Sequence, residues 1–201
     1  AAGGKGANQA VAYSRAGGEV SFVACIGKDL LGDSAIDGFK KDNIDTTYVN
    51  RTSKNPSGVA FIFIDNNGEN SIGVASGSNY DLSPTHLDKA MDSILSADVV
   101  LTQLETPINT VEYLAKIVGI QTSTFILNPA PAQPLSDELL QNIDVITPNE
   151  TEAEQLTGLK VTNAESAQSS CNKLHDLGVE TVIITMGQKG AYLSCSNAHQ
   201  L

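Results

Sequence analysis

Short apolar runs alternate along the chain with stretches whose apolar positions recur at helical spacing. The runs of strand length predict strands over 21–26, 57–64, 70–75, 98–103, 123–127, 144–147, 181–185 and 191–195. The helical spacing predicts helices over 7–16, 33–42, 84–95, 110–118, 136–142, 149–156 and 164–177. Repeated alternation of this kind indicates parallel βαβ units with helices on both faces of the sheet.

One pair of strands interrupts the alternation. The segments 57–64 and 70–75 are joined by Asp-Asn-Asn-Gly-Glu at 65–69, which is turn chemistry, so we predict a hairpin. The pair has no crossover helix of its own and is expected to project as a flap. Its apolar strands can pair with the same hairpin of a second copy or fold back on their own domain.

Composition narrows the class of protein. The chain has 201 residues, 41% of them hydrophobic, and a net charge of −11, which suits one globular domain and argues against a nucleic-acid partner. No apolar run approaches the roughly 20 residues of a membrane span, so no membrane partner is expected. Cys25, Cys171 and Cys195 show no paired spacing, which favours free thiols and a cytoplasmic location. The three histidines are scattered, so a zinc site is not expected.

Residues 3–10 read Gly-Gly-Lys-Gly-Ala-Asn-Gln-Ala and lead directly into a predicted helix. Three glycines in four positions clear side chains from a helix N-terminus, whose N–H groups and positive dipole end suit an oxygen-rich ligand. Lys5 and Asn8 add a cation and an amide. A sugar or a phosphate fits this pattern, and so does a plain glycine turn entering an ordinary helix.

Polar residues follow several of the predicted parallel strands, at the edge where open sheets bind ligands. Asn149 and Glu152 share the first turn of a helix, where they can hold a hydrated Mg²⁺ or form a capping box; taken alone, the pattern favours capping. The loop 185–190 contains two glycines that let a ligand approach its backbone, although a plain hairpin loop has the same composition. Glu105 follows a predicted central strand and suits either sugar hydroxyls or the loop surface.

Three segments together resemble one family. Gly-Gly-Lys-Gly-Ala-Asn-Gln-Ala at 3–10, Asn-Pro-Ala-Pro-Ala at 128–132 and Thr-Pro-Asn-Glu-Thr-Glu-Ala-Glu at 147–154 resemble the ribokinase-like sugar kinases of the phosphofructokinase-B type. The order and spacing fit essentially all 201 residues. The resemblance implies an α/β fold, a three-layer αβα sandwich with a mostly parallel central sheet and a small β-sheet lid. Residues 1–201 are then a single incomplete domain of this kind, with 57–76 as part of the lid.

The resemblance also implies an activity and the residues that serve it. The reaction is transfer of the γ-phosphoryl group of MgATP to a sugar hydroxyl, namely O5 of D-ribose, by a homodimer joined through the lid, with K⁺ as a further cation. The implied sugar-binding residues are Gly4, Lys5, Gly6, Ala7, Asn8 and Glu105. The implied nucleotide-binding residues are Asn149, Thr185, Met186, Gly187, Gln188, Lys189 and Gly190, with Glu152 holding the metal through water.

The chain departs from the family pattern at both ends. The Gly-Ala-Gly-Asp-type segment, whose Asp is the family's catalytic base, does not occur among the 201 residues. The chain also starts without Met, so we expect a piece of a longer protein, one that has no useful kinase activity alone. Alternatives are a kinase for fructose, a keto-deoxy sugar or a nucleoside, or a non-catalytic sugar-binding protein. A dinucleotide-dependent oxidoreductase is disfavoured because the glycine motif lacks the Gly-x-Gly-x-x-Gly spacing.

Overall fold

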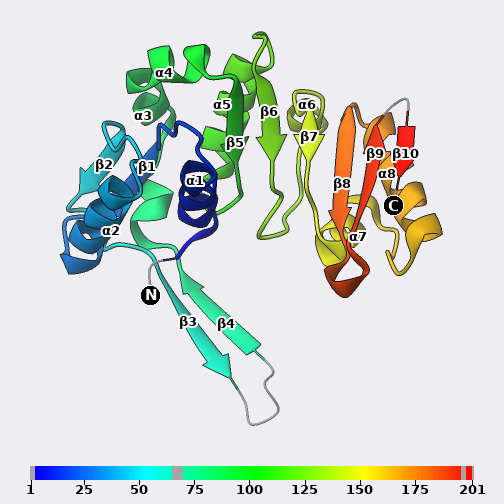
Figure 1. Ribbon diagram of the computed structural model, residues 1–201, viewed down its shortest axis with the longest axis horizontal. Coiled ribbons are helices and arrows are strands. Elements are labelled where there is room, and N and C mark those ends of the chain that lie inside the picture. The colour runs from blue at the N-terminus through cyan, green and yellow to red at the C-terminus, as the bar shows by residue number, and fades with distance from the viewer. Residues whose placement is uncertain (1–2, 65–69, 196–197, 201) are drawn as a thin grey trace. The chain divides into compact units, whose positions relative to one another are not determined.

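A computed structural model describes residues 3–64, 70–195 and 198–200 of the chain (Figure 1). The chain divides into two compact units, one formed by residues 1–91 and 105–110, the other by 92–104 and 111–201. Each unit is described by itself below. The predicted turn at 65–69 lies outside the described residues.

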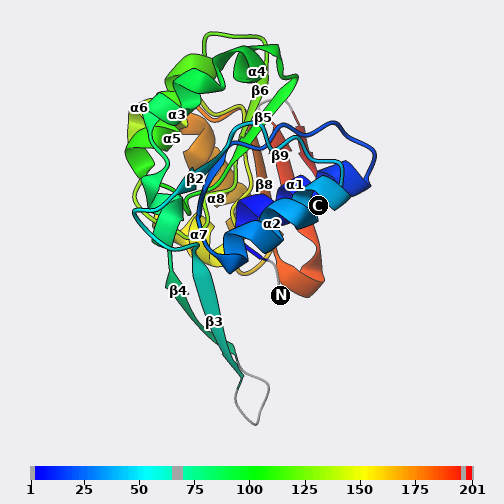
Figure 2. The same ribbon diagram turned by 90° about the vertical axis from the view of Figure 1, so that its left-hand side faces the viewer.

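Within the described residues, the first unit holds two short sheets and three complete α-helices. Strand β1 pairs with β2 in parallel, and β3 pairs with β4 in antiparallel fashion, from Val59 opposite Ala75 to Ile64 opposite Asn70. Figures 1 and 2 show the β3–β4 hairpin extending away from the helices of its own unit. This confirms the predicted hairpin, whereas its use as a lid stays a prediction. The elements are α1 (Lys5–Arg15), β1 (Ala24–Gly27), α2 (Leu30–Lys41), β2 (Val49–Thr52), β3 (Val59–Ile64), β4 (Asn70–Ala75), the 3₁₀ turn η1 (Gly77–Asp81) and α3 (Pro84–Lys89).

Helices α1 and α2 share a small apolar core. Ala10 of α1 and Phe39 of α2 are buried together with Ile44. The rings of Phe22 and Phe39 meet edge to face with their centroids 5.1 Å apart. This cluster fixes α1, and therefore the glycine loop that precedes it.

The second unit is built on a six-stranded sheet in the order β10-β9-β8-β7-β6-β5. Strands β5 to β8 pair in parallel, and β9 and β10 are antiparallel additions. This mixed, mostly parallel sheet agrees with the predicted α/β class. The elements are α4 (Met91–Ser96), β5 (Val99–Thr102), α5 (Ile108–Val118, which starts in the first unit), β6 (Thr124–Leu127), α6 (Asp137–Leu140), β7 (Val145–Ile146), α7 (Glu150–Thr157), α8 (Ala164–Asp176), β8 (Thr181–Thr185), the 3₁₀ turn η2 (Gly187–Lys189), β9 (Ala191–Cys195) and β10 (Ala198–Gln200).

Alternating strand residues form the core of the second unit. Phe125, Leu127 and Ile146 are fully buried, as are Val182 and Ile184 on β8. Helix α8 packs on β8 and β9 through its own buried residues Ala167, Cys171 and Leu174, which recur at helical spacing. Burial of these residues on one helix face explains why the segment 164–176 is helical despite its many polar residues.

The structure departs from the prediction at one helix and at one strand. The helix predicted over 84–95 is two helices, α3 and α4, which are separated at Ala90. Alanine is the best helix former, so the break is not a local preference; it lies where the chain passes from one unit to the other. Strand β2 was not predicted, because Val49–Thr52 is short and polar and is stabilised by pairing with β1.

Asp29 ties the start of α2 to the segment before the hairpin. Its carboxylate accepts hydrogen bonds from the Gly32 N–H at 2.8 Å, the Ser57 N–H at 2.7 Å and the Ser57 hydroxyl at 2.8 Å. The backbones of Gly27 and Ser57 lie close together, since a Cβ on Gly27 would lie 2.4 Å from the Ser57 nitrogen. These hydrogen bonds, led by that from the Ser57 backbone, lower the pKa of Asp29.

We predict that Asp29 contributes an acid-sensitive part of the stability. A depressed pKa in the folded state means that the charged form stabilises the fold, so this contribution is present above the unfolded pKa and is lost as pH falls through the folded value. Denaturant unfolding from pH 6 downward should show a smaller loss of stability for Asp29→Asn than for the unchanged protein. Asp37→Asn, on the exposed face of the same helix, is the control and should keep the original pH dependence.

Candidate functional site

The N-terminus of α1 meets the carboxylate of Glu105, a residue 100 positions away in the sequence. The Lys5 N–H donates a hydrogen bond to Glu105 Oε2 at 2.7 Å. Gly4 precedes the helix with φ 97°, a conformation that L-residues with side chains rarely adopt, and it provides no side-chain cap. Glu105 therefore supplies the negative charge that the positive end of the helix dipole favours.

Local packing holds Glu105 at this position. The segment 105–110 belongs to the same unit as α1, and Thr110 is buried there. Its hydroxyl donates a hydrogen bond to the Leu82 carbonyl at 3.1 Å. The half-buried Glu105 side chain thus has a fixed oxygen, Oε2, beside the glycine loop.

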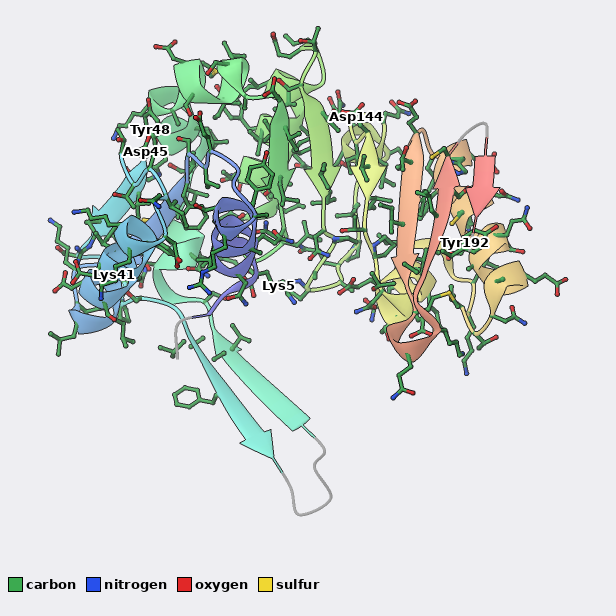
Figure 3. All side chains as sticks on the ribbon, viewed as in Figure 1. Lys5, Lys41, Asp45, Tyr48, Asp144 and Tyr192 are labelled. Atoms are coloured by element: carbon green, nitrogen blue, oxygen red, sulfur yellow. The ribbon has the colours of Figure 1, made fainter. Side chains whose placement is uncertain are left out.

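The predicted sugar-binding residues lie together in the first unit. Gly4 and Asn8 are exposed, whereas Lys5, Gly6 and Ala7 are half-buried. Figure 3 shows Lys5 at the start of α1. A carboxylate, an amide and a cation around a helix N-terminus can bind a polyhydroxylated molecule through several hydrogen bonds.

Asn149 and Glu152 form a reciprocal capping box at the start of α7. The Asn149 side chain accepts a hydrogen bond from the Glu152 N–H at 2.8 Å, and Glu152 Oε2 accepts one from the Asn149 N–H at 2.8 Å. Glu152 is only 8% exposed. The capping alternative weighed from the sequence is therefore present, and it fixes one carboxylate oxygen of a buried glutamate at a helix N-terminus.

The end of β8 lies beside the start of α7. Asn149 bridges to Thr185, and the Thr185 N–H donates to the Pro148 carbonyl at 2.9 Å. In Figure 1, β6, β7 and β8 run in the same direction, and both α7 and the turn after β8 lie at the edge where these strands end. The structure thus brings together the two segments that were predicted from the sequence to bind a nucleotide.

The loop after β8 presents mainly backbone groups at its surface. Gly187 and Gly190 have φ 56° and 89°, and both are exposed together with Gln188. Met186 is 2% exposed, so its side chain belongs to the core rather than to the loop surface. Lys189 Nζ donates to the Thr162 carbonyl at 2.7 Å, a contact that the sequence did not predict.

A further pair links the ends of β6 and β7. Asn128 Nδ2 donates to the Thr147 carbonyl at 3.0 Å and to its hydroxyl at 3.3 Å. Asn128 and Thr147 are the first residues of the sequence motifs at 128–132 and 147–154, but the contact between them was not predicted. The hydrogen bonds that the Asn128 amide makes at this edge of the sheet therefore explain why an amide stands there.

The metal-ligating side chains of the described part of the chain do not gather in one place. No group of three or more His, Cys, Asp or Glu residues there could hold a metal ion among themselves. Cys25, Cys171 and Cys195 are free thiols, and burial raises the pKa of Cys171 to about 12, which removes its thiolate at neutral pH.

None of the helices within residues 3–64, 70–195 and 198–200 is both long and apolar enough to cross a membrane.

Comparison with known proteins gives the family. A model of the pfkB family carbohydrate kinases matches residues 1–200. The chain is 49% identical to the ribokinase of Haemophilus influenzae over 192 residues, which are 96% of this chain and 63% of that protein. It is 42% identical to the ribokinase of Staphylococcus aureus over 198 residues, or 98% of this chain and 65% of that protein.

A solved structure supports the same assignment. The ribokinase of Arabidopsis thaliana, complexed with ribose and ATP, superposes with a TM-score of 0.90 at 31% identity, covering 98% of this chain and 64% of that one. The chain thus spans somewhat less than two thirds of the length of these relatives. The likeness confirms the predicted ribokinase-like α/β fold, and with the family match it shows that the chain belongs to the pfkB family of carbohydrate kinases.

Proposed function

We propose that the protein containing this chain is an ATP-dependent kinase that phosphorylates D-ribose at O5 to give ribose 5-phosphate. The observation that carries the proposal is the identity of 49% to a ribokinase across 96% of the chain. The relative from Arabidopsis thaliana, complexed with ribose and ATP, supports the same pair of substrates.

The sugar is proposed to bind at the glycine loop of α1. Glu105 accepts hydrogen bonds from ribose hydroxyls, and its orientation is fixed by the bond from the Lys5 N–H. Asn8 adds amide donors and an acceptor from the exposed side of the same helix turn. Holding the sugar rigidly is the main contribution this chain can make to phosphoryl transfer, which depends on positioning.

The nucleotide is proposed to bind along the end of β8 and the start of α7. Exposed backbone at Gly187 and Gly190 lets a nucleotide approach closely. Mg²⁺, when bound with ATP, neutralises charge on the phosphates. Glu152 fits a water-mediated contact with that ion better than direct ligation, because its carboxylate is buried and one oxygen already accepts from the Asn149 N–H.

Three further proposals follow from the family. A second copy is proposed to pair at the β3–β4 hairpin, where Phe61 and Val74 are 60% and 62% exposed. A cytoplasmic location agrees with the free thiols. Dependence on K⁺ rests on the family alone.

Substitution at Glu105 tests the sugar site. Glu105→Gln keeps an acceptor for the Lys5 N–H but loses the charge, so we expect kcat/KM for ribose to fall about 10- to 100-fold. The KM for ATP should stay unchanged in a coupled ADP assay on the whole protein. Glu138→Gln is the control, since that side chain is 67% exposed on α6. A preference for fructose or adenosine over ribose in the same assay would contradict the proposed substrate.

A matched pair of caps tests the nucleotide site. Asn149 and Asn163 cap α7 and α8 with the same capping-box geometry. Asn149→Ala and Asn163→Ala should each lower the free energy of unfolding by about 0.5–2 kcal/mol. Only Asn149→Ala should also raise the KM for ATP. An equal effect of both variants on ATP would mean that Asn149 serves the helix alone.

We also expect the 201-residue chain alone to be inactive. It contains no Gly-Ala-Gly-Asp-type segment to supply the base and the anion hole of the family. The measurement is ribose-dependent ADP formation by the purified chain, with circular dichroism to show that it is folded. Ribose-dependent turnover by material of this length would disprove the expectation.

A further inference from the structure

A cavity of about 430 Å³ lies in the first unit, apart from the glycine loop and Glu105. Its volume falls within the range of small-molecule sites, roughly 300–1,000 Å³. Strands β1 and β2, the loop after β2, the end of η1 and helix α3 all contribute to it. The lining residues are Cys25, Asn50, Arg51, Thr52, Ser53, Lys54, Asp81, His86 and Lys89.

The charge of this cavity is opposite to that of the chain. Arg51, Lys54 and Lys89 line it against the single carboxylate of Asp81, in a chain whose net charge is −11. Lys54 is 79% exposed at its side chain and its ammonium group lies 3.4 Å from Asp81 Oδ1; Lys89 is also exposed. A local excess of cations in an acidic protein favours an anionic ligand.

His86 adds an imidazole. The Ser83 N–H donates to His86 Nδ1 at 3.1 Å and the Ser83 hydroxyl lies 2.9 Å from the same nitrogen; with Nδ1 as acceptor, the ring proton is on Nε2. Arg51 adds little net charge, because its guanidinium already forms an ion pair with Asp33 Oδ1 at 2.6 Å and donates to the Gly27 carbonyl at 3.1 Å. The cavity therefore offers two exposed ammonium groups, one of them paired with Asp81, and an imidazole, beside a guanidinium that is already paired with Asp33.

Asp81 is the exception to this pattern. Its side chain is only 8% exposed; Oδ1 accepts from Asn55 Nδ2 at 2.8 Å and lies 3.4 Å from Lys54 Nζ. Its other oxygen, Oδ2, is buried without a hydrogen-bond partner. A carboxylate that is buried and half-satisfied is costly. If an anion draws Lys54 away, Asp81 needs a replacement donor, which the ligand itself must bring.

We propose that this cavity is a binding site for a small phosphorylated polyol. Its phosphate is held by Lys54 and Lys89 with the Nε2–H of His86, and one of its hydroxyls donates to the Asp81 carboxylate. The site shares no lining residue with the proposed ribose and ATP sites, and it does not depend on the proposed reaction. A phosphate ester without hydroxyl groups contacts only the cationic side chains and the imidazole, and a polyol without phosphate contacts only Asp81.

Ligands that are not substrates or products of the proposed reaction test this inference. Isothermal titration of the whole protein would compare glycerol 3-phosphate, propyl phosphate, inorganic phosphate and glycerol. Glycerol 3-phosphate should bind about tenfold more tightly than propyl phosphate, because only the former has hydroxyl groups that can donate hydrogen bonds to Asp81. Binding of both should weaken as salt increases, and glycerol should not bind measurably.

Variants at Asp81 and the lysines should change binding in opposite directions. Asp81→Ala should weaken glycerol 3-phosphate and strengthen propyl phosphate and inorganic phosphate, because it removes both an acceptor and a repelling charge. Lys54→Met and Lys89→Met should weaken every phosphate about three- to tenfold. If Asp81→Ala does not fold, Asp81→Asn, which keeps the shape of the side chain, replaces it in the titrations.

The control has the same change of charge away from the cavity. Lys41→Met, at the exposed end of α2 (Figure 3), removes one cation from the same unit and should leave all affinities unchanged. The proposal fails if glycerol 3-phosphate and propyl phosphate bind equally, or if Lys41→Met has the same effect as Lys89→Met. Because none of these ligands is ribose or ATP, failure here leaves the proposed kinase function intact.

Discussion

The contact between Glu105 and the start of α1 joins sequence positions that are 100 residues apart. It satisfies an N–H group that no cap in the glycine loop can satisfy, since Gly4 has no side chain. The same arrangement leaves a carboxylate with a fixed direction beside an exposed, glycine-lined helix end. The stabilising role and the proposed sugar-binding role therefore use the same charge. A helix N-terminus gains from a nearby carboxylate whether or not a ligand is bound.

The capping box of α7 likewise combines a stabilising role with a proposed binding role. Asn149 and Glu152 satisfy each other's backbone N–H groups, which accounts for both residues without a ligand. What distinguishes this cap from that of α8 is its place. Asn149 is bridged to Thr185 at the end of a parallel strand, whereas Asn163 precedes a helix at no such strand end. A cap becomes a candidate binding site because of what the sheet places next to it.

The cavity of the first unit shows that net charge says little about local binding. A chain with a charge of −11 still gathers three cationic side chains around one pocket. They come from β2, the loop after it and α3, and their sequence positions show no basic cluster. Asp81 distinguishes this pocket from a simple cluster of cations, because a nearly buried carboxylate lies among them.

The sequence alone determined the elements whose signals are local. Alternating apolar strands and capped helices were predicted within a few residues, as for Thr181–Thr185, and the three family motifs identified the fold. Tertiary structure decided what depends on contacts between distant segments. The polar strand Val49–Thr52 exists because β1 pairs with it, and the break at Ala90 lies where the chain changes unit. The partners of Glu105 and Asp81 were likewise decided by the fold, because hydrogen bonds across 100 or 26 residues leave no periodic trace in the sequence.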